Sequence, residues 1–388
     1  MGARPAPIVP LAAAVGLVLV AVLTLSLFTG RIPFLPAKAG GGDGVVDRTP
    51  APSNVVIVDP RSKVPGSIVY AKAGNIWIQS GSQATQLSGS GHDSMPTWSS
   101  DGRWIYYVET RTERGIYPYG GAPVYYDLTY PVLVRVHPDG SGRDEVATGK
   151  FTRSGGQYQW FYWIRQPVPD PSGKVLAVMS DGPEPTRNDV VLQLLDVASG
   201  KMTNPGLPEN APLGHQDPAW KPGSSARQLL YVMDGRDGTR GRPTIWRYDL
   251  RTKKASVLTA PGYMGPAWSP DGRWIVATKQ ASLGTDLVII DPSTGTEVKR
   301  ITNDGHSWGA TWSPNGDAIA FLHIDGGIVD LRMIQVAISG GAVTIGDSLA
   351  LTESSGLDPA SRPSWYIPAD QLPPTAGPSA TASGSAAP

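Results

Sequence analysis

The sequence predicts an all-β fold, a six-bladed β-propeller, from one phrase that recurs along the chain. The phrase reads PTWSSDGRWIYYV at 96–108, PAWSPDGRWIVA at 266–277 and ATWSPNGDAIAFL at 310–322. A looser copy occupies 218–232, and a truncated copy, RPSWYIP, occupies 362–368. Repeats spaced a few tens of residues apart are typical of folds in which each unit needs its neighbours to bury its faces.

Each repeat predicts four short antiparallel strands joined by tight turns, named strands a to d from the axis outward. Strand a carries a large aromatic residue, which is Trp98, Trp220, Trp268, Trp312 or Trp365 in the five copies. A Ser-Pro-Asp-Gly type of turn follows, because Pro presets φ and Gly or Asn tolerates the left-handed conformation. Alternating apolar residues then indicate strand b, and two more short strands follow. Units of this kind stack radially into a propeller.

The spacing of the strand-a phrases gives the number of blades. The intervals that follow Trp220 are 48, 44 and 53 residues, whereas Trp98 and Trp220 are 122 residues apart. A degenerate copy without the Trp, QPVPDPSGKVLAVMS at 166–180, divides that long interval into two blades. The segment 67–88 supplies strands b, c and d without a strand a. We therefore expect a shared blade, made of the C-terminal strand at 362–368 and these three N-terminal strands, whose closure leaves no exposed edge.

The PxWSPDGRxIAF-type repeat, followed by a strand and a short strand that ends in Leu-Thr, resembles the TolB-type, WD40-like propeller family of bacteria. The resemblance covers 67–368 and rests on turn and core residues. It implies the fold and a location outside the cytoplasm. It leaves the function open, because one fold hosts many functions.

Composition excludes several classes of function. The 388 residues carry 33 basic and 33 acidic side chains, so nothing indicates a nucleic-acid footprint. The absence of Cys excludes disulfides, thiol chemistry and Cys-based metal sites. The chain has no Gly-x-Ser-x-Gly elbow, no phosphate loop and no His-Glu-x-x-His pair. We therefore expect a monomer without catalytic activity.

The N-terminal region predicts attachment to a membrane. Residues 8–30 contain no charge, and this is long enough to span a bilayer and longer than the usual core of a cleavable signal. We expect an uncleaved, single-pass anchor in the cell membrane, with a cleaved signal peptide as the alternative. Arg4 on one side and Arg31 and Lys38 on the other leave the positive-inside rule nearly balanced. The family resemblance favours a propeller outside the cytoplasm.

The expected organisation has five parts. They are a short N-terminal tail (1–7), the transmembrane helix (8–30), a flexible linker (31–66), the propeller (67–368) and a disordered tail rich in Pro, Ser, Thr and Ala (369–388).

The long connections gather on one predicted face of the ring, which carries the b–c and d–a loops. A b–c insertion at 110–130 and a d–a connection at 151–166 are rich in aromatic residues, and the b–c loops at 181–189 and 234–243 are rich in Arg and Asp. Long loops on a rigid scaffold commonly carry binding residues, and Tyr and Trp are frequent anchors. The predicted binding residues are Tyr117, Tyr119, Tyr125, Tyr126, Tyr130, Tyr158 and Trp160. The alternative is that these aromatics fill the gap left by the blade without a Trp, with 160–163 forming part of its strand a.

A Gly-His pair precedes strand a in three blades and suggests a metal site. His92, His215 and His306 would then stand on alternate blades around one channel mouth. Three neutral imidazoles can hold a divalent metal with an open position, and some six-bladed propeller lyases are built on a similar plan. Two observations favour a packing role instead: inner strands of alternate blades stand well apart, and Tyr263 takes the equivalent place in another blade.

The leading hypothesis is a membrane-anchored extracytoplasmic propeller that binds an envelope protein, a peptide or a glycan through its long-loop face, without a cofactor. The alternative is a metal-dependent polysaccharide lyase that uses the three histidines. A third possibility is a structural spacer in an envelope complex, with no small ligand.

Overall fold

The computed structural model describes residues 58–119, 122–153, 158–185, 189–207, 214–223, 227–234 and 242–372. The predicted N-terminal tail and anchor, most of the linker and residues 373–388 lie outside these ranges. Within them, no helix is both long enough and apolar enough to cross a membrane. The described end of the linker contains a short 3-10 helix, η1 (Pro60–Lys63), and a second one, η3 (Ala369–Gln371), follows the last strand.

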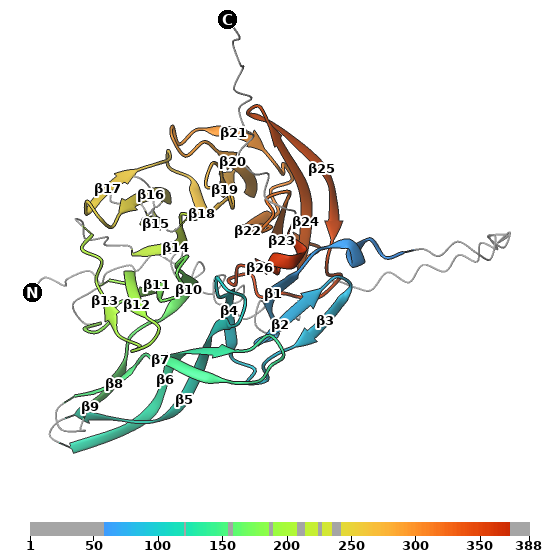
Figure 1. Cartoon of the computed structure of the whole chain (residues 1–388). Coiled ribbons are helices and arrows are strands. Elements are labelled where there is room, and N and C mark those ends of the chain that lie inside the picture. Colours follow the sequence, from blue (N-terminus) through green and yellow to red (C-terminus); the bar gives the residue numbers. More distant parts are fainter. Residues whose placement is uncertain are drawn as a thin grey trace, which may run out of the picture. The chain divides into compact units, whose positions relative to one another are not determined.

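The described residues between 58 and 372 form a ring of six four-stranded antiparallel sheets (Figure 1). The predicted all-β, six-bladed propeller is therefore confirmed. In each sheet the strand of the Trp phrase, or of its degenerate copy without Trp, is the innermost one (Figure 1). From strand a outward, one sheet contains β4 (Asp93–Trp98), β5 (Ile105–Tyr119), β6 (Ala122–Val136) and β7 (Asp144–Thr148). The next sheet contains β10 (Arg165–Pro169), β11 (Val175–Ser180), β12 (Val191–Asp196) and β13 (Met202–Thr203). A third sheet contains β14 (His215–Trp220), β15 (Gln228–Met233), β16 (Thr244–Asp249) and β17 (Lys254–Val257).

The remaining sheets follow the same pattern. They are β18 (Tyr263–Trp268), β19 (Ile275–Ala281), β20 (Gly284–Ile290) and β21 (Glu297–Arg300); β22 (Ser307–Trp312), β23 (Ala318–Asp325), β24 (Ile328–Ser339) and β25 (Ala342–Ala350); and β26 (Ser364–Tyr366), β1 (Ser67–Lys72), β2 (Asn75–Ser80) and β3 (Gln83–Gln86). A separate two-stranded sheet contains β8 (Lys150–Arg153) and β9 (Tyr158–Phe161).

The last of these sheets contains strands from both ends of the described chain. β26 pairs antiparallel with β1, so that Ser67 lies opposite Tyr366. Trp365 is 6% exposed, and its indole N–H donates to the carbonyl of Pro65 at 2.9 Å. The ring of Tyr366 covers Gly102 so closely that a Cβ there would stand 2.0 Å from it. These contacts tie β26 to β1 on one side and to the first Trp-phrase turn on the other.

Apolar side chains from neighbouring blades form the core. The described residues contain six hydrophobic clusters, and each lies at one of the six interfaces between adjacent blades. In β1, Ile68 and Tyr70 belong to the interface with β23 and β24, whereas Val69 and Ala71 belong to the interface with β4 and β5. Because successive side chains of a strand point to opposite faces, one strand serves two interfaces.

The turn of the Trp phrase is closed by its own side chains. Ser99 Oγ donates to Asp101 Oδ1 at 2.7 Å and accepts from the Trp104 N–H at 2.9 Å. Ser269 and Asp271 make the same bonds in another blade. The repeated Ser and Asp are thus used within the turn.

The two long insertions differ from the expected loops, because they form paired strands. β5 and β6 pair without interruption from Ile105 opposite Val136 to Tyr119 opposite Ala122. β8 and β9 form a second hairpin within the predicted d–a connection. The alternative in which 160–163 belongs to strand a is also wrong, since strand a of that blade is β10 and begins at Arg165. β-branched and aromatic residues at alternate positions continue the strand pattern past the core.

Replacement of Trp365 by Ala should lower the free energy of unfolding by about 3–5 kcal/mol, because it leaves a cavity at the interface that joins β26 to β1. Chemical denaturation measures the effect. Leu283→Ala is the control, since Leu283 is 89% exposed and its loss should change stability little. Equal stability of the two variants would show that β26 does not hold the ring together.

Candidate functional site

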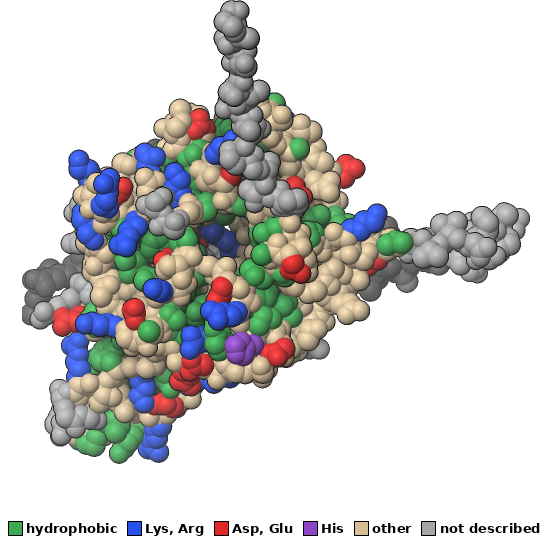
Figure 2. All heavy atoms as spheres, in the orientation of Figure 1, with side chains coloured by type: hydrophobic (Ala, Val, Ile, Leu, Met, Phe, Trp, Pro, Cys, Tyr) green, Lys and Arg blue, Asp and Glu red, His purple; other side chains and the backbone are tan. Residues whose placement is uncertain are grey.

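The most prominent departure from the repeat is a projection that we call the aromatic arm. It consists of residues 110–131 of the β5–β6 hairpin together with the β8–β9 hairpin, and it extends outward from the ring (Figure 1). Figure 2 shows hydrophobic side chains gathered at its outer end. The exposed large hydrophobic residues of the arm include Tyr117, Val124 and Tyr125.

Hydrogen bonds hold the two hairpins of the arm together. The hydroxyl of Tyr126 donates to the carbonyl of Gln159 at 2.5 Å, and the side-chain oxygen of Gln159 accepts from the Ile116 N–H at 3.1 Å. Gly115 makes room for this contact, because a Cβ at that position would stand 3.0 Å from the Tyr126 ring. The aromatic side chains therefore stand on an ordered support rather than on a loop.

Four of the predicted binding residues form one continuous array of rings. Tyr158 lies at its centre, with its ring centroid 5.4 Å from that of Tyr117 and 6.3 Å from that of Trp160. Tyr126 contacts Trp160 from the β6 side at 6.1 Å. Offset or edge-on arrangements at such distances are favourable for aromatic pairs.

The other three predicted residues have different environments. Tyr125 is 53% exposed, and the guanidinium of Arg114 lies 4.2 Å from its ring centroid. Tyr130 is buried at the base of the arm, where its hydroxyl donates to Glu113 Oε2 at 3.0 Å. Tyr119 ends β5, and its side chain lies outside the described residues. Tyr130 is thus part of the support, whereas Tyr125 is available to a partner.

An apolar cavity of about 410 Å³ lies between the hairpins of the arm. Its walls include Tyr126, Leu128, Tyr130, Trp160, Phe161 and Trp163. Trp163 was not among the predicted binding residues, yet it is 44% exposed, and Arg165 stacks near its ring with a guanidinium-to-centroid distance of 6.0 Å. Its position next to the aromatic run at 158–162 was the available sequence signal.

Burial and hydrogen bonding shift the pKa of three groups in the arm. Burial raises the pKa of Tyr126 and of Tyr158, so both hydroxyls remain protonated donors at neutral pH. The hydrogen bond from Lys150 lowers the pKa of Glu113, which stays ionised. The arm can therefore offer flat apolar rings with hydroxyl groups at their edges.

The structure does not bring the three predicted metal ligands together. His92 and His306 are exposed, whereas His215 is 5% exposed, accepts a hydrogen bond at Nδ1 from the Leu192 N–H at 3.2 Å and lies 4.6 Å from the Tyr231 ring. Among the described residues, no three His, Asp or Glu side chains are grouped closely enough to hold a metal ion.

The physical reason is a difference of one residue in spacing. His92 and His306 each precede the strand-a Trp by six residues, whereas His215 precedes Trp220 by five. Since side chains alternate between the two faces of a strand, this shift sends His215 into the interface between blades.

Comparisons with known proteins point to one family of propellers. No protein-family model matches the chain. Among curated proteins, the Tol-Pal system protein TolB of Francisella tularensis is 27% identical over 236 residues, which cover 59% of this chain and 45% of that protein. The chain thus spans less than half the length of the curated relatives that it matches.

Solved structures give the same result at the level of fold. TolB from Acinetobacter baumannii superposes with a TM-score of 0.53 at 18% identity, covering 77% of this chain and 66% of that one. A putative TolB from Agrobacterium tumefaciens gives 0.52 at 17% identity, covering 79% and 95%. With the sequence similarity, these matches confirm the resemblance to TolB-type propellers that the repeats predict.

Tyr126→Phe should loosen the β8–β9 hairpin, because it removes the hydroxyl that donates to Gln159 and keeps the ring. Loss of a hydrogen bond of about 1 kcal/mol should make the open form of this hairpin roughly fivefold more populated, so its amides should exchange roughly fivefold faster. Hydrogen exchange of the amides in 150–153 and 158–161 measures it. Tyr125→Phe is the matched control and should leave exchange unchanged; equal exchange in both variants would contradict the role given to Tyr126.

His215 should make stability depend on pH. Burial lowers its pKa from 6.5 to about 4, so the folded protein resists protonation that the unfolded chain accepts. Its contribution is intact above pH 6.5 and falls as the pH drops towards 4, by about 3 kcal/mol in total. Unfolding experiments on His215→Asn, which retains an acceptor for Leu192, should show a correspondingly shallower decline. The exposed His92→Asn is the control; a decline as steep in His215→Asn as in His92→Asn would refute the assignment.

Proposed function

We propose that this TolB-like propeller is a non-catalytic binding module of the bacterial cell envelope, which recognises an envelope protein, a peptide or a glycan through the aromatic arm. The observation that carries the proposal is the exposure of Tyr117, Tyr125 and Trp163, at 40%, 53% and 44%, on a hydrogen-bonded support. Large apolar rings that remain exposed on an ordered surface are typical of interaction sites.

The chemistry of the arm supports this type of binding. Tyr and Trp supply a large rigid contact area, and few rotatable bonds are immobilised when they bind. Arg114 over Tyr125 and Arg165 beside Trp163 add charge at the edges of these rings. The adjoining cavity of about 410 Å³ could accept one apolar side chain or the face of a sugar ring.

The location in the envelope rests on the relatives and on the N-terminal sequence. The curated relative is named for the Tol-Pal system, and the structural likeness shows the same fold. Residues 8–30 lack charge over a length that can span a bilayer. We therefore propose a single-pass membrane anchor with the propeller outside the cytoplasm.

The lyase alternative finds no support in the described residues. It required His92, His215 and His306 to share one metal ion, and their side chains do not converge. Elemental analysis of the purified protein, together with its stability in a chelator, tests this alternative independently.

The test of the proposed function is recovery of partners by the full-length protein. Pull-down from envelope extracts and binding to glycan arrays should weaken by at least about tenfold in Tyr125→Ala and in Trp163→Ala, the loss expected for a central aromatic anchor. Leu283→Ala, which removes an exposed hydrophobic residue from another blade, should bind as the wild type does. Retention of every detected partner by both arm variants would show that the arm is not the binding surface.

A further inference from the structure

One position recurs around the inside of the ring, three residues before the aromatic position of each strand a. The six residues there are Met95, Gln166, Asp217, Gly265, Gly309 and Arg362, which we call the channel positions. All six line a central cavity of about 640 Å³. Figure 2 shows the opening at the centre of the ring, with the blue of a basic side chain inside it.

The backbone at five channel positions is unusual. Met95, Gln166 and Asp217 have φ of 55°, 49° and 54°, and Gly265 and Gly309 share the left-handed region. The pairing with strand b shifts register at each of them. Non-glycine residues in this region are strained and are found disproportionately at functional sites. At Met95, Gln166 and Asp217 the bulge places the side chain in the wall of the central cavity, whereas at the two glycines it leaves the wall without a side chain.

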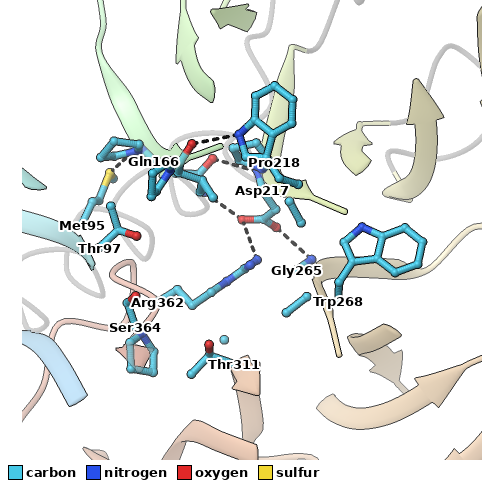
Figure 3. Close-up of a pocket in the computed structure, with 18 of the residues that line it drawn as sticks. Met95, Thr97, Gln166, Asp217, Pro218, Gly265, Trp268, Thr311, Arg362 and Ser364 are labelled. Atoms are coloured by element: carbon cyan, nitrogen blue, oxygen red, sulfur yellow. Dashed lines mark hydrogen bonds and ion pairs between the residues drawn. The ribbon is translucent and has the colours of Figure 1, made fainter. Parts of the chain in front are cut away.

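Asp217 is held by neutral donors from two neighbouring blades. Its Oδ1 accepts from the side-chain amide of Gln166 at 2.8 Å, and its Oδ2 accepts from the Gly265 N–H at 2.9 Å (Figure 3). The Gln166 side-chain oxygen in turn accepts from the Asp217 N–H at 2.9 Å. Both carboxylate oxygens of Asp217 therefore accept a hydrogen bond from a neutral group.

Arg362 lies opposite, with most of its donors unused. Its Nη1 donates to the Pro266 carbonyl at 2.9 Å. Its Nη2 stands 3.7 Å from Asp217 Oδ1, which is an ion pair without a hydrogen bond (Figure 3). Gly265 lies beside it, and a Cβ at that position would be in van der Waals contact with Nη2 at 3.5 Å. A guanidinium has five N–H donors, and among the described residues the Pro266 carbonyl is the one hydrogen-bond acceptor recorded for Arg362. Burial lowers the pKa of Arg362, although the group remains a cation.

The charge and shape of the cavity select a type of ligand. Of the residues that line it, three ionise, Arg165, Asp217 and Arg362, which leaves one net positive charge. The walls also carry prolines, methionines and Leu322. A volume of about 640 Å³ falls within the range of small-molecule sites. A planar guanidinium matches a carboxylate through two parallel hydrogen bonds.

We propose that the central channel binds a small monocarboxylate, whose carboxylate accepts hydrogen bonds from Arg362 and whose apolar body lies against the proline and methionine walls. This site is separate from the aromatic arm and does not depend on the function proposed for it. The carboxylate belongs to a free small molecule or to the C-terminal end of a peptide.

The experiment compares N-acetylphenylalanine with its uncharged primary amide, using calorimetry on the full-length protein. The carboxylate should bind at least about tenfold more tightly than the amide, as expected for a partly buried, charge-assisted pair. Arg362→Gln should abolish this preference. Arg273→Gln removes an arginine whose side chain is 78% exposed on a turn and should leave it unchanged.

A second variant keeps the test decisive if Arg362→Gln is poorly folded. Gly309→Asn leaves Arg362 intact and places a neutral side chain in the channel. Asn tolerates the φ of 63° at this position. The nearest atom to its Cβ would be Leu322 Cδ1 at 3.4 Å. It should lose carboxylate binding while keeping a cooperative unfolding transition.

The proposal is overturned if neither probe binds at up to about 10 mM, if both bind equally, or if Gly309→Asn binds as the wild type does. The affinity of a hexapeptide that ends in phenylalanine shows whether the carboxylate belongs to a peptide or to a small molecule. Tighter binding of the hexapeptide than of N-acetylphenylalanine identifies a peptide end, and equal or weaker binding identifies a small molecule.

Discussion

Every blade must bury apolar side chains on both of its faces, and the rest of the structure depends on this constraint. Ile68 and Val69 are adjacent in β1, yet they belong to the cores on opposite sides of their blade. A sheet of four short strands cannot bury the apolar side chains of both its faces alone, so it requires a neighbouring blade on each side. Six such interfaces make a ring. Residues that line its central channel or its outer edge lie outside these interfaces and are not needed for the core.

Residues are free for function where the chain departs from this alternation. The β5–β6 hairpin does so by continuing beyond the interface core, which leaves Tyr117 and Tyr125 outside it. The bulges of strand a do so within the ring, where the side chains of Met95, Gln166 and Asp217 line the central cavity. The arm offers exposed aromatic area, and the channel offers a partly buried cation. Trp163 and Arg165, two residues apart, lie where the arm meets the ring.

Much of the fold could be predicted from the sequence, because the repeated turn residues and Trp mark strand a in five blades and the spacing reveals the sixth. The arm was predicted as loops, since its strand pattern extends past the length at which a blade strand normally ends. The metal site was predicted from a dipeptide without regard to strand phase, although the shift of His215 against Trp220 was visible. The channel network could not be predicted from residue types alone. Gln166, Asp217 and Arg362 are far apart in the chain, and only the closed ring brings them together.

We propose that the arm, and not the ring as a whole, contacts the partner. The most direct measurement is photo-crosslinking in living cells, with a photoreactive phenylalanine analogue in place of Tyr125 or, separately, of Leu283, both of which are exposed. Binding through the arm should give one discrete cross-linked partner from position 125 and none from position 283. Cross-links of equal yield from both positions, or from position 283 alone, would contradict it.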